Sequence, residues 1–470
     1  MSAAVPAPAT WPDVRVLQLG TPELGDSSYV IASGGEVAVV DPQRDLDRLE
    51  AVLCEVGGRL VAVLETHVHN DYVSGGPALA AARGAEYVVP AGSGCTADHR
   101  AIEDGGEVRA GHAVLRALRT PGHTPHHTSY ELLLSGRAAA IFTGGSVLVG
   151  ACGRTDLLGP ELAEELTRAQ YRSAQRIGER PDPTVLGPTH GAGSFCSSSG
   201  TGGETWTTVG REKVVNLVFL APDEDSFVAG HLSARLDFPA YYLEMAPINR
   251  AGAPAWRPRP PAVLGVDELV ALQDSGVVLV DVRDRASFAE AHIPGSINVE
   301  LGDSFATYLG WAFPFGTRFA LVSAAGQDVE PAFRQCARIG IEDIEGVAED
   351  PFAAWRASGR TLRRYPVTDV AGLRQAVDGR QGLVLDVRQR LEWLDGHVPG
   401  SVNVHVAELP MRLPELPRDR RVYVHCLSGS RATIAASLLD ASGFDVELVG
   451  DGFAEWAQGH HPIESGDPAA

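Results

Sequence analysis

Short apolar runs that alternate with amphipathic stretches fill the first part of the chain. The predicted elements are strands at 14–19, 28–32, 37–41 and 60–64, and helices at 45–56 and 157–177. The 60–64 run is apolar at every position, as expected for a strand that is buried on both faces. This alternation of strands and helices is typical of an α/β domain.

Three apolar runs, at 60–64, 114–118 and 184–188, each end in a histidine motif. The motifs are Thr66-His67-Val68-His69-Asn70-Asp71, Pro121-Gly122-His123-Thr124 and Thr189-His190-Gly191. In an extended turn, residues i and i+2 point to the same side, so His67 and His69 can face one ion. A single histidine is usually structural, but ligands bind at the carboxyl ends of strands in α/β sheets. The repeated pattern therefore predicts a metal site.

The second half of the chain repeats itself after a proline-rich linker at 253–261. Asp281-Val282-Arg283 and His292-Ile293-Pro294-Gly295-Ser296 recur as Asp386-Val387-Arg388 and His397-Val398-Pro399-Gly400-Ser401. Two long, imperfect copies indicate a duplicated domain and not a solenoid of short repeats.

The two copies differ at the residue that follows the apolar run, where a nucleophile is expected. In the second copy the apolar run 421–425 leads into Cys426, a short loop and a predicted helix at 431–439. Loop N–H groups and a helix N-terminus stabilise a thiolate, so Cys426 is the predicted nucleophile. The residues expected to act with it are Arg431 in catalysis, and Ser428 and Gly429 in binding an anionic substrate. The alternative is a buried structural cysteine.

The first copy has Ser323 at the position of Cys426, and its loop lacks the arginine. Without a thiolate it cannot carry a persulfide, so we expect this copy to be catalytically silent. Cys336, on the following predicted helix, is expected to belong to the core.

Length and charge limit the classes of function. A chain of 470 residues predicts two to three domains. The net charge of −21 argues against a nucleic-acid or anionic-membrane partner. Six scattered cysteines do not form a disulfide framework, which favours a reducing compartment. With no basic leader and no apolar run of membrane-spanning length, the expected location is the cytoplasm.

The histidine motifs, with Phe142-Thr143-Gly144-Gly145 and Cys152-Gly153-Arg154-Thr155-Asp156, resemble the metallo-β-lactamase fold. The most similar subgroup is the persulfide dioxygenases, which use mononuclear non-haem iron. The duplicated half resembles rhodanese domains. The resemblance implies an αββα sandwich over 1–252, a rhodanese-like α/β domain without the catalytic cysteine over 262–363, and a rhodanese domain with Cys426 over 366–465.

Two departures from this resemblance affect the metal. A dinuclear zinc hydrolase of the fold would have His at 72 and a bridging Asp at 145, but this chain has Tyr72 and Gly145. The iron enzymes also use that Asp as a ligand. Either a third histidine or Asp71 completes the site, or the iron site is weakened. The preferred ligands are His67, His69 and His123, with Asp71 as the alternative.

The resemblance also implies substrates. Arg154 is expected to hold the carboxylate of a thiol such as glutathione, unless it forms a salt bridge with Asp156 or Glu161. Cys196 is a candidate persulfide carrier, or a plain loop cysteine. The predicted function is Fe(II)-dependent oxidation of a thiol persulfide by O2 to sulfite, coupled to thiosulfate sulfurtransferase chemistry at Cys426. The alternatives are a zinc thioester hydrolase and a metal-free sulfur carrier. The subgroup is often dimeric, so a homo-oligomer is expected.

Overall fold

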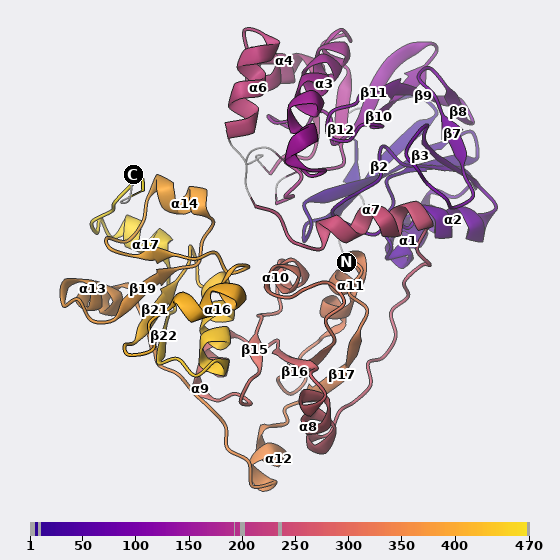
Figure 1. The fold of residues 1–470 in the computed structure, drawn as a ribbon. Coiled ribbons are helices and arrows are strands. Elements are labelled where there is room, and N and C mark those ends of the chain that lie inside the picture. The colour runs from indigo at the N-terminus through magenta and orange to yellow at the C-terminus, as the bar shows by residue number, and fades with distance from the viewer. Residues whose placement is uncertain (1–4, 8–10, 192, 198–202, 234–236, 468–470) are drawn as a thin grey trace. The chain divides into compact units, whose positions relative to one another are not determined.

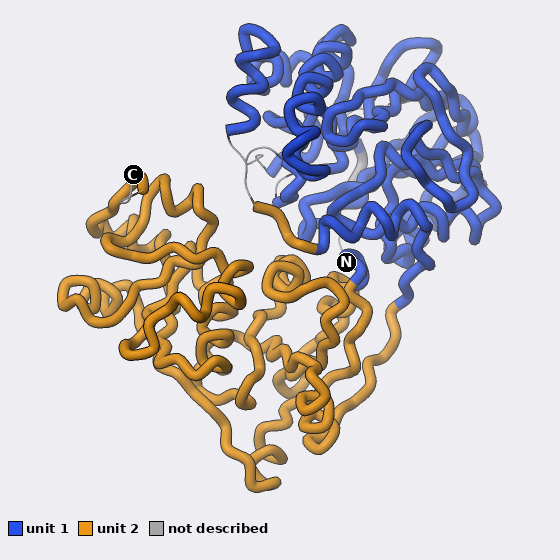
Figure 2. The backbone as a smooth tube through the Cα atoms, viewed as in Figure 1, with its two compact units in different colours: residues 1–235, 241–257, 337–340 blue, residues 236–240, 258–336, 341–470 orange. Residues whose placement is uncertain are grey.

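The computed structural model describes residues 5–7, 11–191, 193–197, 203–233 and 237–467. It forms two compact units, coloured blue and orange in Figure 2. Unit 1 contains Met1–Arg235, Tyr241–Arg257 and Ala337–Gly340, and unit 2 contains Leu236–Ala240, Pro258–Cys336 and Ile341–Ala470. The predicted domain limits at 252, 262–363 and 366–465 stay predictions.

Unit 1 is built on two sheets (Figure 1). The first has the order β1 (Val5–Pro6), β2 (Val14–Thr21), β3 (Asp26–Ser33), β4 (Glu36–Val40), β5 (Arg59–Leu64), β6 (Glu86–Pro90) and β7 (Arg100–Ile102). The second has the order β13 (Thr207–Thr208), β12 (Val185–Pro188), β11 (Arg137–Gly144), β10 (Thr128–Leu134), β9 (Ala113–Arg119) and β8 (Glu107–Ala110). Strands β4 to β7 pair in parallel, and β12 pairs in parallel with β11.

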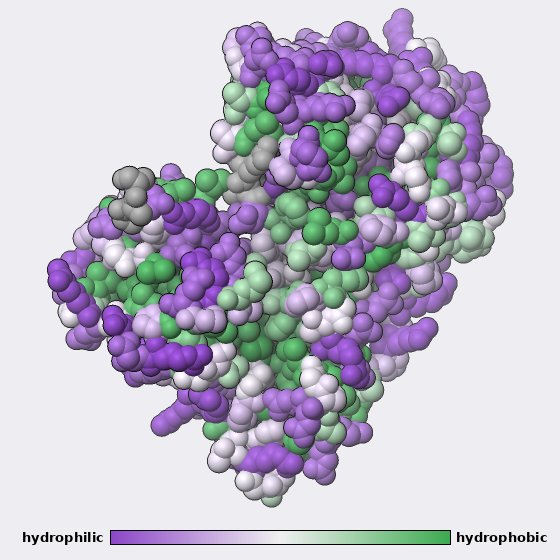
Figure 3. Space-filling model, viewed as in Figure 1, coloured by the Kyte–Doolittle hydropathy of each residue, from purple (hydrophilic) through white to green (hydrophobic). Residues whose placement is uncertain are grey.

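The helices of unit 1 complete four layers. They are α1 (Leu46–Val56), α2 (Gly76–Arg83), α3 (Pro160–Gly178), α4 (Val209–Val215), α5 (Leu217–Leu220), α6 (Glu224–Ser233) and α7 (Tyr242–Ala251). Apolar residues of α1 and α2 pack on the outer face of the first sheet, and those of α3 and α4 pack on the second. Hydrophilic residues predominate on the visible surface of unit 1, with apolar groups between them (Figure 3). Arg172 of α3 pairs with Glu224 of α6 at 2.8 Å. The αββα prediction is confirmed.

The core between the two sheets explains the uniform apolar run of β5. Ala62 and Leu64 face this inter-sheet core, where Tyr130 and Phe142 come from the second sheet. Val63 points the other way, into the helical layer. Both faces of β5 are therefore buried, and the strand delivers the His67 loop at its carboxyl end.

Unit 2 contains two parallel sheets. Their orders are β15 (Ile297–Asn298), β14 (Val278–Asp281), β16 (Phe319–Ser323), β17 (Ile344–Glu349), and β18 (Val367–Thr368), β22 (Val446–Val449), β21 (Val422–His425), β19 (Leu383–Asp386), β20 (Val402–Asn403). The helices are α8 (Val266–Asp274), α9 (Arg285–Glu290), α10 (Phe305–Ala312), α11 (Glu330–Arg338), α12 (Phe352–Ala357), α13 (Val370–Asp378), α14 (Arg390–Asp395), α15 (Leu409–Arg412), the 3-10 helix η1 (Leu413–Glu415), α16 (Ser430–Ala441) and α17 (Phe453–Gln458). Within the described residues, no helix is long and apolar enough to cross a membrane.

The motif shared by the two repeats is structural. Arg283 forms a buried bidentate pair with Asp281, and Arg388 forms the same pair with Asp386. Asn298 donates to the carbonyl groups of Asp281 and Arg283 in the first repeat. These contacts fix the strand ends in both repeats, so the shared motif does not distinguish a catalytic copy from a silent one.

Candidate metal and thiol sites

Three histidines from three strand ends meet in unit 1. His67 follows β5, His123 follows β9 and His190 follows β12, and each offers a ligand atom within 4.8 Å of the others. All three side chains are buried. The Nε2 atoms of His67 and His190 lie 3.3 Å apart. The convergence expected from the strand ends is therefore present in the structure.

The imidazoles of His67, His123 and His190, and that of the neighbouring His69, each use one ring nitrogen for a protein partner. The contacts are His67 Nδ1 with Thr66 Oγ1 at 2.8 Å, His123 Nδ1 with the Arg154 carbonyl at 2.7 Å, His190 Nδ1 with Asp26 Oδ1 at 2.8 Å, and His69 Nε2 with Glu65 Oε2 at 3.1 Å. Within the described ranges, His123 Nε2 and His69 Nδ1 have no hydrogen-bond partner, while Asp71 Oδ2 lies 3.1 Å from His190 Nδ1. Buried polar atoms normally have partners, and a cation is one that imidazole nitrogens accept.

Burial and neighbouring charges set the protonation of the cluster. Burial lowers the pKa of His123 to about 3, and the nearby charge of His190 adds to this effect. Burial likewise lowers the pKa of His67. Burial opposes the charge on His190, but Asp71 and Asp26 outweigh it and raise the pKa of His190 to about 10. His67 and His123 are therefore neutral imidazoles, the form that binds a metal.

The predicted ligands belong to three overlapping groups of potential ligands. His67 and His123 group with His190, and His69 and Asp71 group with the same His190. His69 also groups with Asp41 and Glu65. The ring centroids of His67 and His69 are 4.1 Å apart, so the i, i+2 spacing does place them side by side. The ligand set preferred from the sequence, His67, His69 and His123, leaves out His190. The sequence nevertheless places His190 after a strand, as it does His67 and His123.

Asp26 is a site residue that the sequence analysis does not identify. It stands at the start of β3, and an isolated bridge to His190 brings it into the cluster. Burial and the charge of Asp71 raise the pKa of Asp26 to about 8. No motif surrounds Asp26 in the sequence, so only the folded structure shows that it orients His190.

The structure explains why positions 72 and 145 depart from the hydrolase pattern. A Cβ atom on Gly145 would lie 2.2 Å from Cδ2 of His123, so no side chain fits there while His123 holds its position. The Tyr72 hydroxyl lies 3.0 Å from Nε2 of His69. Asp41 and Glu65 contact the same nitrogen, at 3.3 and 3.1 Å. Tyr72 and Gly145 therefore do not supply the ligands of the hydrolase pattern, although Asp41, Glu65 and His69 lie close enough together to be ligands.

Arg154 and Cys196 lie beside the cluster. The guanidinium of Arg154 forms a bidentate pair with Asp156, at 3.0 and 2.8 Å, which is one of the two alternatives that the sequence leaves open. The carbonyl group of Cys196 accepts from the Arg154 N–H at 2.8 Å. Burial, and then the charges of Asp71 and Asp26, raise the pKa of the Cys196 thiol well above its usual value. Cys196 is therefore a protonated thiol in this structure.

The predicted nucleophile Cys426 lies between β21 and α16. Its Sγ accepts a hydrogen bond of 3.1 Å from the Gly429 N–H, and its side chain is buried. Gly429 has φ = 97°, and a Cβ atom there would collide with Arg285. Arg431 is turned to Glu392, with contacts of 2.5 and 2.9 Å. The loop therefore presents the Gly429 N–H group to the sulfur, while the arginine is held by a carboxylate.

Family comparisons match both halves of the chain. The metallo-β-lactamase superfamily matches residues 21–190, and the rhodanese-like domain family matches 265–356 and 369–459. A Bos taurus protein named persulfide dioxygenase ETHE1, mitochondrial, is 31% identical over 181 residues, which are 38% of this chain and 68% of that protein. The chain belongs to the metallo-β-lactamase superfamily. The predicted fold class and the two rhodanese-like domains are thereby confirmed.

A hydrolase and a solved structure are also similar to this lactamase-fold chain. A hydroxyacylglutathione hydrolase from Cereibacter sphaeroides is 34% identical over 166 residues, so the chain spans only 59% of that relative and the match covers 34% of this chain. A crystal structure of a metallo-β-lactamase from Staphylococcus aureus has a TM-score of 0.64 at 26% identity. It covers 72% of this chain and 99% of its own, so the likeness extends beyond the lactamase match.

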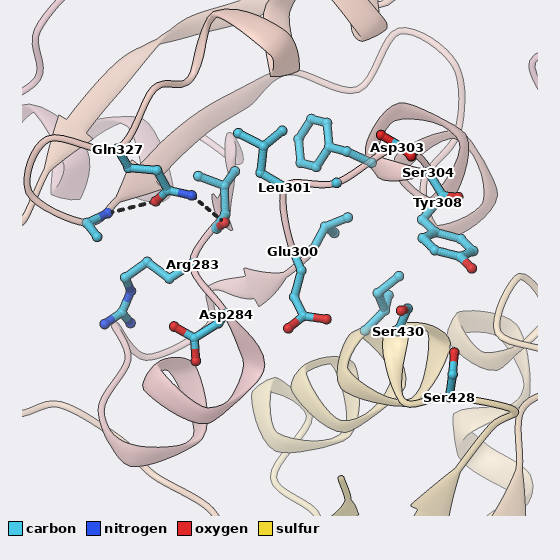
Figure 4. A pocket seen from close by; sticks show the side chains of 16 residues that line it. Arg283, Asp284, Glu300, Leu301, Asp303, Ser304, Tyr308, Gln327, Ser428 and Ser430 are labelled. Atoms are coloured by element: carbon cyan, nitrogen blue, oxygen red, sulfur yellow. Dashed lines mark hydrogen bonds between the residues drawn. The ribbon is translucent and has the colours of Figure 1, made fainter. Parts of the chain in front are cut away.

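The first rhodanese-like domain is matched over 265–356, and we call it the silent domain because we expect it to lack activity. Its loop donors are already occupied. Gln327 Oε1 accepts from the Ala324 N–H at 3.0 Å, and Gln327 Nε2 donates to the Val282 carbonyl (Figure 4). Glu349 accepts from the Gly326 N–H at 2.6 Å. A thiolate at Ser323 would therefore lack the N–H groups that Cys426 receives.

This occupied loop predicts that a thiol alone will not restore chemistry to the silent domain. In a Cys426→Ser background, Ser323→Cys should leave thiosulfate turnover at the background level, because Gln327 and Glu349 still hold the loop donors. Thiocyanate formation from thiosulfate and cyanide measures this. Substantial turnover by the double variant would show that the loop of the silent domain is competent.

Proposed function

We propose that this chain oxidises low-molecular-weight thiol persulfides with O2 at an iron site in its lactamase-fold domain, and that Cys426 exchanges sulfane sulfur with thiosulfate. The observation that carries the first part is the pair of buried, unpartnered ring nitrogens on His123 and His69, in a cluster that also holds Asp71. The bovine relative, named a persulfide dioxygenase, supports the same chemistry.

The residues present fit a mononuclear iron. Imidazole and carboxylate donors suit non-haem Fe(II), and the candidates are His67, His69, His123 and Asp71, with His190 beside them. Iron held there would supply the redox chemistry that allows O2 to oxidise a persulfide sulfur. Zinc is the alternative metal, because it accepts the same donors.

The surrounding residues orient the ligands and exclude water. Asp26 fixes the ring of His190, the carbonyl group of Arg154 fixes His123, and Glu65 fixes His69. The balanced reaction is R–S–SH + O2 + H2O → R–SH + SO₃²⁻ + 2H⁺. Arg154 remains the candidate for a substrate carboxylate, which would have to compete with Asp156 for the guanidinium.

The sulfurtransferase step uses Cys426. Its thiolate attacks the outer sulfur of thiosulfate, the S–S bond breaks, and sulfite leaves with the electron pair. The N–H group of Gly429 already donates to Sγ and is placed to stabilise its negative charge. Ser428, Gly429 and Arg431 are the proposed substrate-side residues. Run in reverse, the same step would convert sulfite from the first site to thiosulfate.

A zinc thioester hydrolase is the second candidate function. The hydroxyacylglutathione hydrolase relative favours it, because its identity to this chain, 34%, is similar to the 31% of the bovine persulfide dioxygenase. Tyr72 and Gly145 oppose it, because they occupy the places from which a second metal would be held.

Iron content tests the ligand set. His69→Ala should remove most of the iron from purified protein, since its buried Nδ1 has no protein partner. Asp71→Asn keeps the shape of the side chain and should weaken iron binding by roughly 10–100-fold or more. Affinity falls by this range when a residue that hydrogen-bonds to a metal ligand is replaced. His112→Ala, at an exposed histidine, is the matched control. Full iron content in His69→Ala would exclude His69 and leave Asp71 and His190 to complete the site.

A further inference from the structure

A cavity of about 300 Å³ lies in the helical layer of unit 1. Its walls come from the segment 150–152 and from the region of α5 and α6, the second of which is labelled in Figure 1. None of its lining residues belongs to the histidine cluster, and none is an aspartate, glutamate, lysine or arginine. The volume is in the range of small-molecule sites in proteins.

Cys152 and His231 form a thiol–imidazole pair in this cavity. Both residues line it, and Cys152 Sγ lies 3.7 Å from His231 Nδ1. An imidazole beside a thiol can take up its proton and leave the thiolate, which is the nucleophilic form of cysteine. The proposed persulfide oxidation and sulfur transfer use neither residue, so the pair is available for other chemistry.

The histidine of the pair stands on a helix that is anchored at its other end. His231 lies on α6, and Arg168 and Arg172 of α3 both pair with Glu224 at the start of α6. The ring of Phe227 packs against the imidazole of His231, with the ring centroids 5.1 Å apart. These contacts fix the helix and the ring, so His231 is held beside the thiol.

The cysteine of the pair stands on a loop that is fixed from α4 and the residue after it. The Gly150 N–H donates to Glu212 of α4 at 2.9 Å. The side-chain amide of Asn216 donates to the Ala151 carbonyl at 2.6 Å. Cys152 itself packs among apolar residues of the helical layer. The loop therefore presents the thiol to the cavity in a defined position.

The lining favours attack on a sulfur–sulfur bond over acyl transfer. Acyl transfer develops an oxyanion, which needs hydrogen-bond donors to stabilise it. The N–H groups of Gly150, Ala221 and Ser226, three described residues of the lining, already donate to acceptors within the protein. A thiolate that attacks a disulfide develops no oxyanion, and the departing thiolate needs only a proton. An imidazole such as that of His231 can return this proton.

The walls of the cavity select the charge of its ligand. Leu217, Leu220 and Phe227 supply apolar surface. A charged group placed against such walls loses its hydration and finds no counter-charge among them, whereas an apolar group gains free energy by burial. The lining therefore favours an uncharged ligand with an apolar body.

We propose that Cys152 and His231 form a thiol-modification site for uncharged organic disulfides. The Cys152 thiolate attacks one sulfur of the ligand, a new Sγ–S bond forms, and the S–S bond of the ligand breaks. The departing sulfur keeps the electron pair and takes the proton from His231. The balanced step is Cys152–SH + R–S–S–R → Cys152–S–S–R + R–SH, and it needs no other oxidant. The proposal is independent of the iron site and of Cys426.

Two disulfides of different charge test the ligand class in the full chain. Dithiodipyridine is uncharged at neutral pH, whereas dithiobis(nitrobenzoate) is anionic. Peptide mass spectrometry follows each cysteine, and the exposed Cys54 corrects for the intrinsic reactivity of each reagent. The rate at Cys152 relative to Cys54 should be about tenfold or more higher with the uncharged reagent, because its burial costs no charge. Equal relative rates, or no adduct at Cys152, would overturn the proposal.

Replacement of the imidazole tests the pair. His231→Phe keeps an aromatic ring beside Phe227 but removes the proton acceptor. Modification of Cys152 by dithiodipyridine at neutral pH should therefore slow by about tenfold or more. His112→Phe, at an exposed histidine outside the cavity, is the matched control and should leave the rate unchanged. An unchanged rate in His231→Phe would overturn the role of His231.

A charge at the rim tests the cavity without disturbing the core. Leu220 lines the cavity and is 52% exposed, so Leu220→Lys can extend its ammonium group into solvent. This variant should narrow the preference for the uncharged reagent, because the ammonium group attracts the anionic one. Val214→Lys, at an exposed valine that does not line the cavity, is the matched control. An unchanged preference in Leu220→Lys, or an equal effect of both variants, would show that the reagents do not enter through this cavity.

Discussion

Cys426→Ser should lower thiosulfate turnover by roughly a thousandfold or more, since loss of a covalent nucleophile removes the step that it performs. Oxygen uptake on added glutathione persulfide should change little, because Cys426 and the histidine cluster belong to different compact units. With persulfide alone, the variant should release more sulfite and less thiosulfate. An oxygen electrode and separation of the sulfur anions measure both effects.

Cys54→Ser is the matched control, because Cys54 is an exposed cysteine outside both sites. It should leave both activities intact. If oxygen uptake in Cys426→Ser falls as far as thiosulfate turnover, Cys426 serves the iron site directly and the two-site account fails.

His123→Ala should abolish oxygen uptake and remove most of the bound iron. Its Nδ1 is fixed by the Arg154 carbonyl, which leaves Nε2 as a buried donor without a protein partner in the described part of the chain. His67→Ala should have the same effect, because its Nε2 faces that of His190. Elemental analysis and oxygen uptake measure the loss.

Both variants should keep the thiosulfate turnover of Cys426, which serves as an internal control for folding. His112→Ala provides the matched surface substitution. Full iron content and full oxygen uptake in either cluster variant would remove that histidine from the ligand set.

The sequence predicts the strands and their histidines well because these features are local. The apolar run of β5 and the i, i+2 spacing of His67 and His69 follow from burial and backbone geometry alone. The thiol site is predictable for the same reason. Cys426, Gly429 and the start of α16 are neighbours in the chain, and the turn between them determines which N–H groups face the sulfur.

Features that depend on contacts between distant residues are not predictable in this way. Asp26 reaches His190 across 164 positions, and no motif marks it. The loop of the silent domain lacks a cysteine in the sequence, but its blockage by Gln327 depends on how that side chain folds back. The sequence leaves two partners open for Arg154, and only the folded loop shows its pairing with Asp156.

Oxygen uptake by the iron-loaded wild-type protein tests the central claim most directly. With glutathione persulfide as the only substrate, the account predicts that one O2 is consumed for each molecule of sulfite or thiosulfate formed, and that S-D-lactoylglutathione is not hydrolysed. Thioester hydrolysis by a zinc-loaded protein, with no oxygen consumed on persulfide, would contradict it.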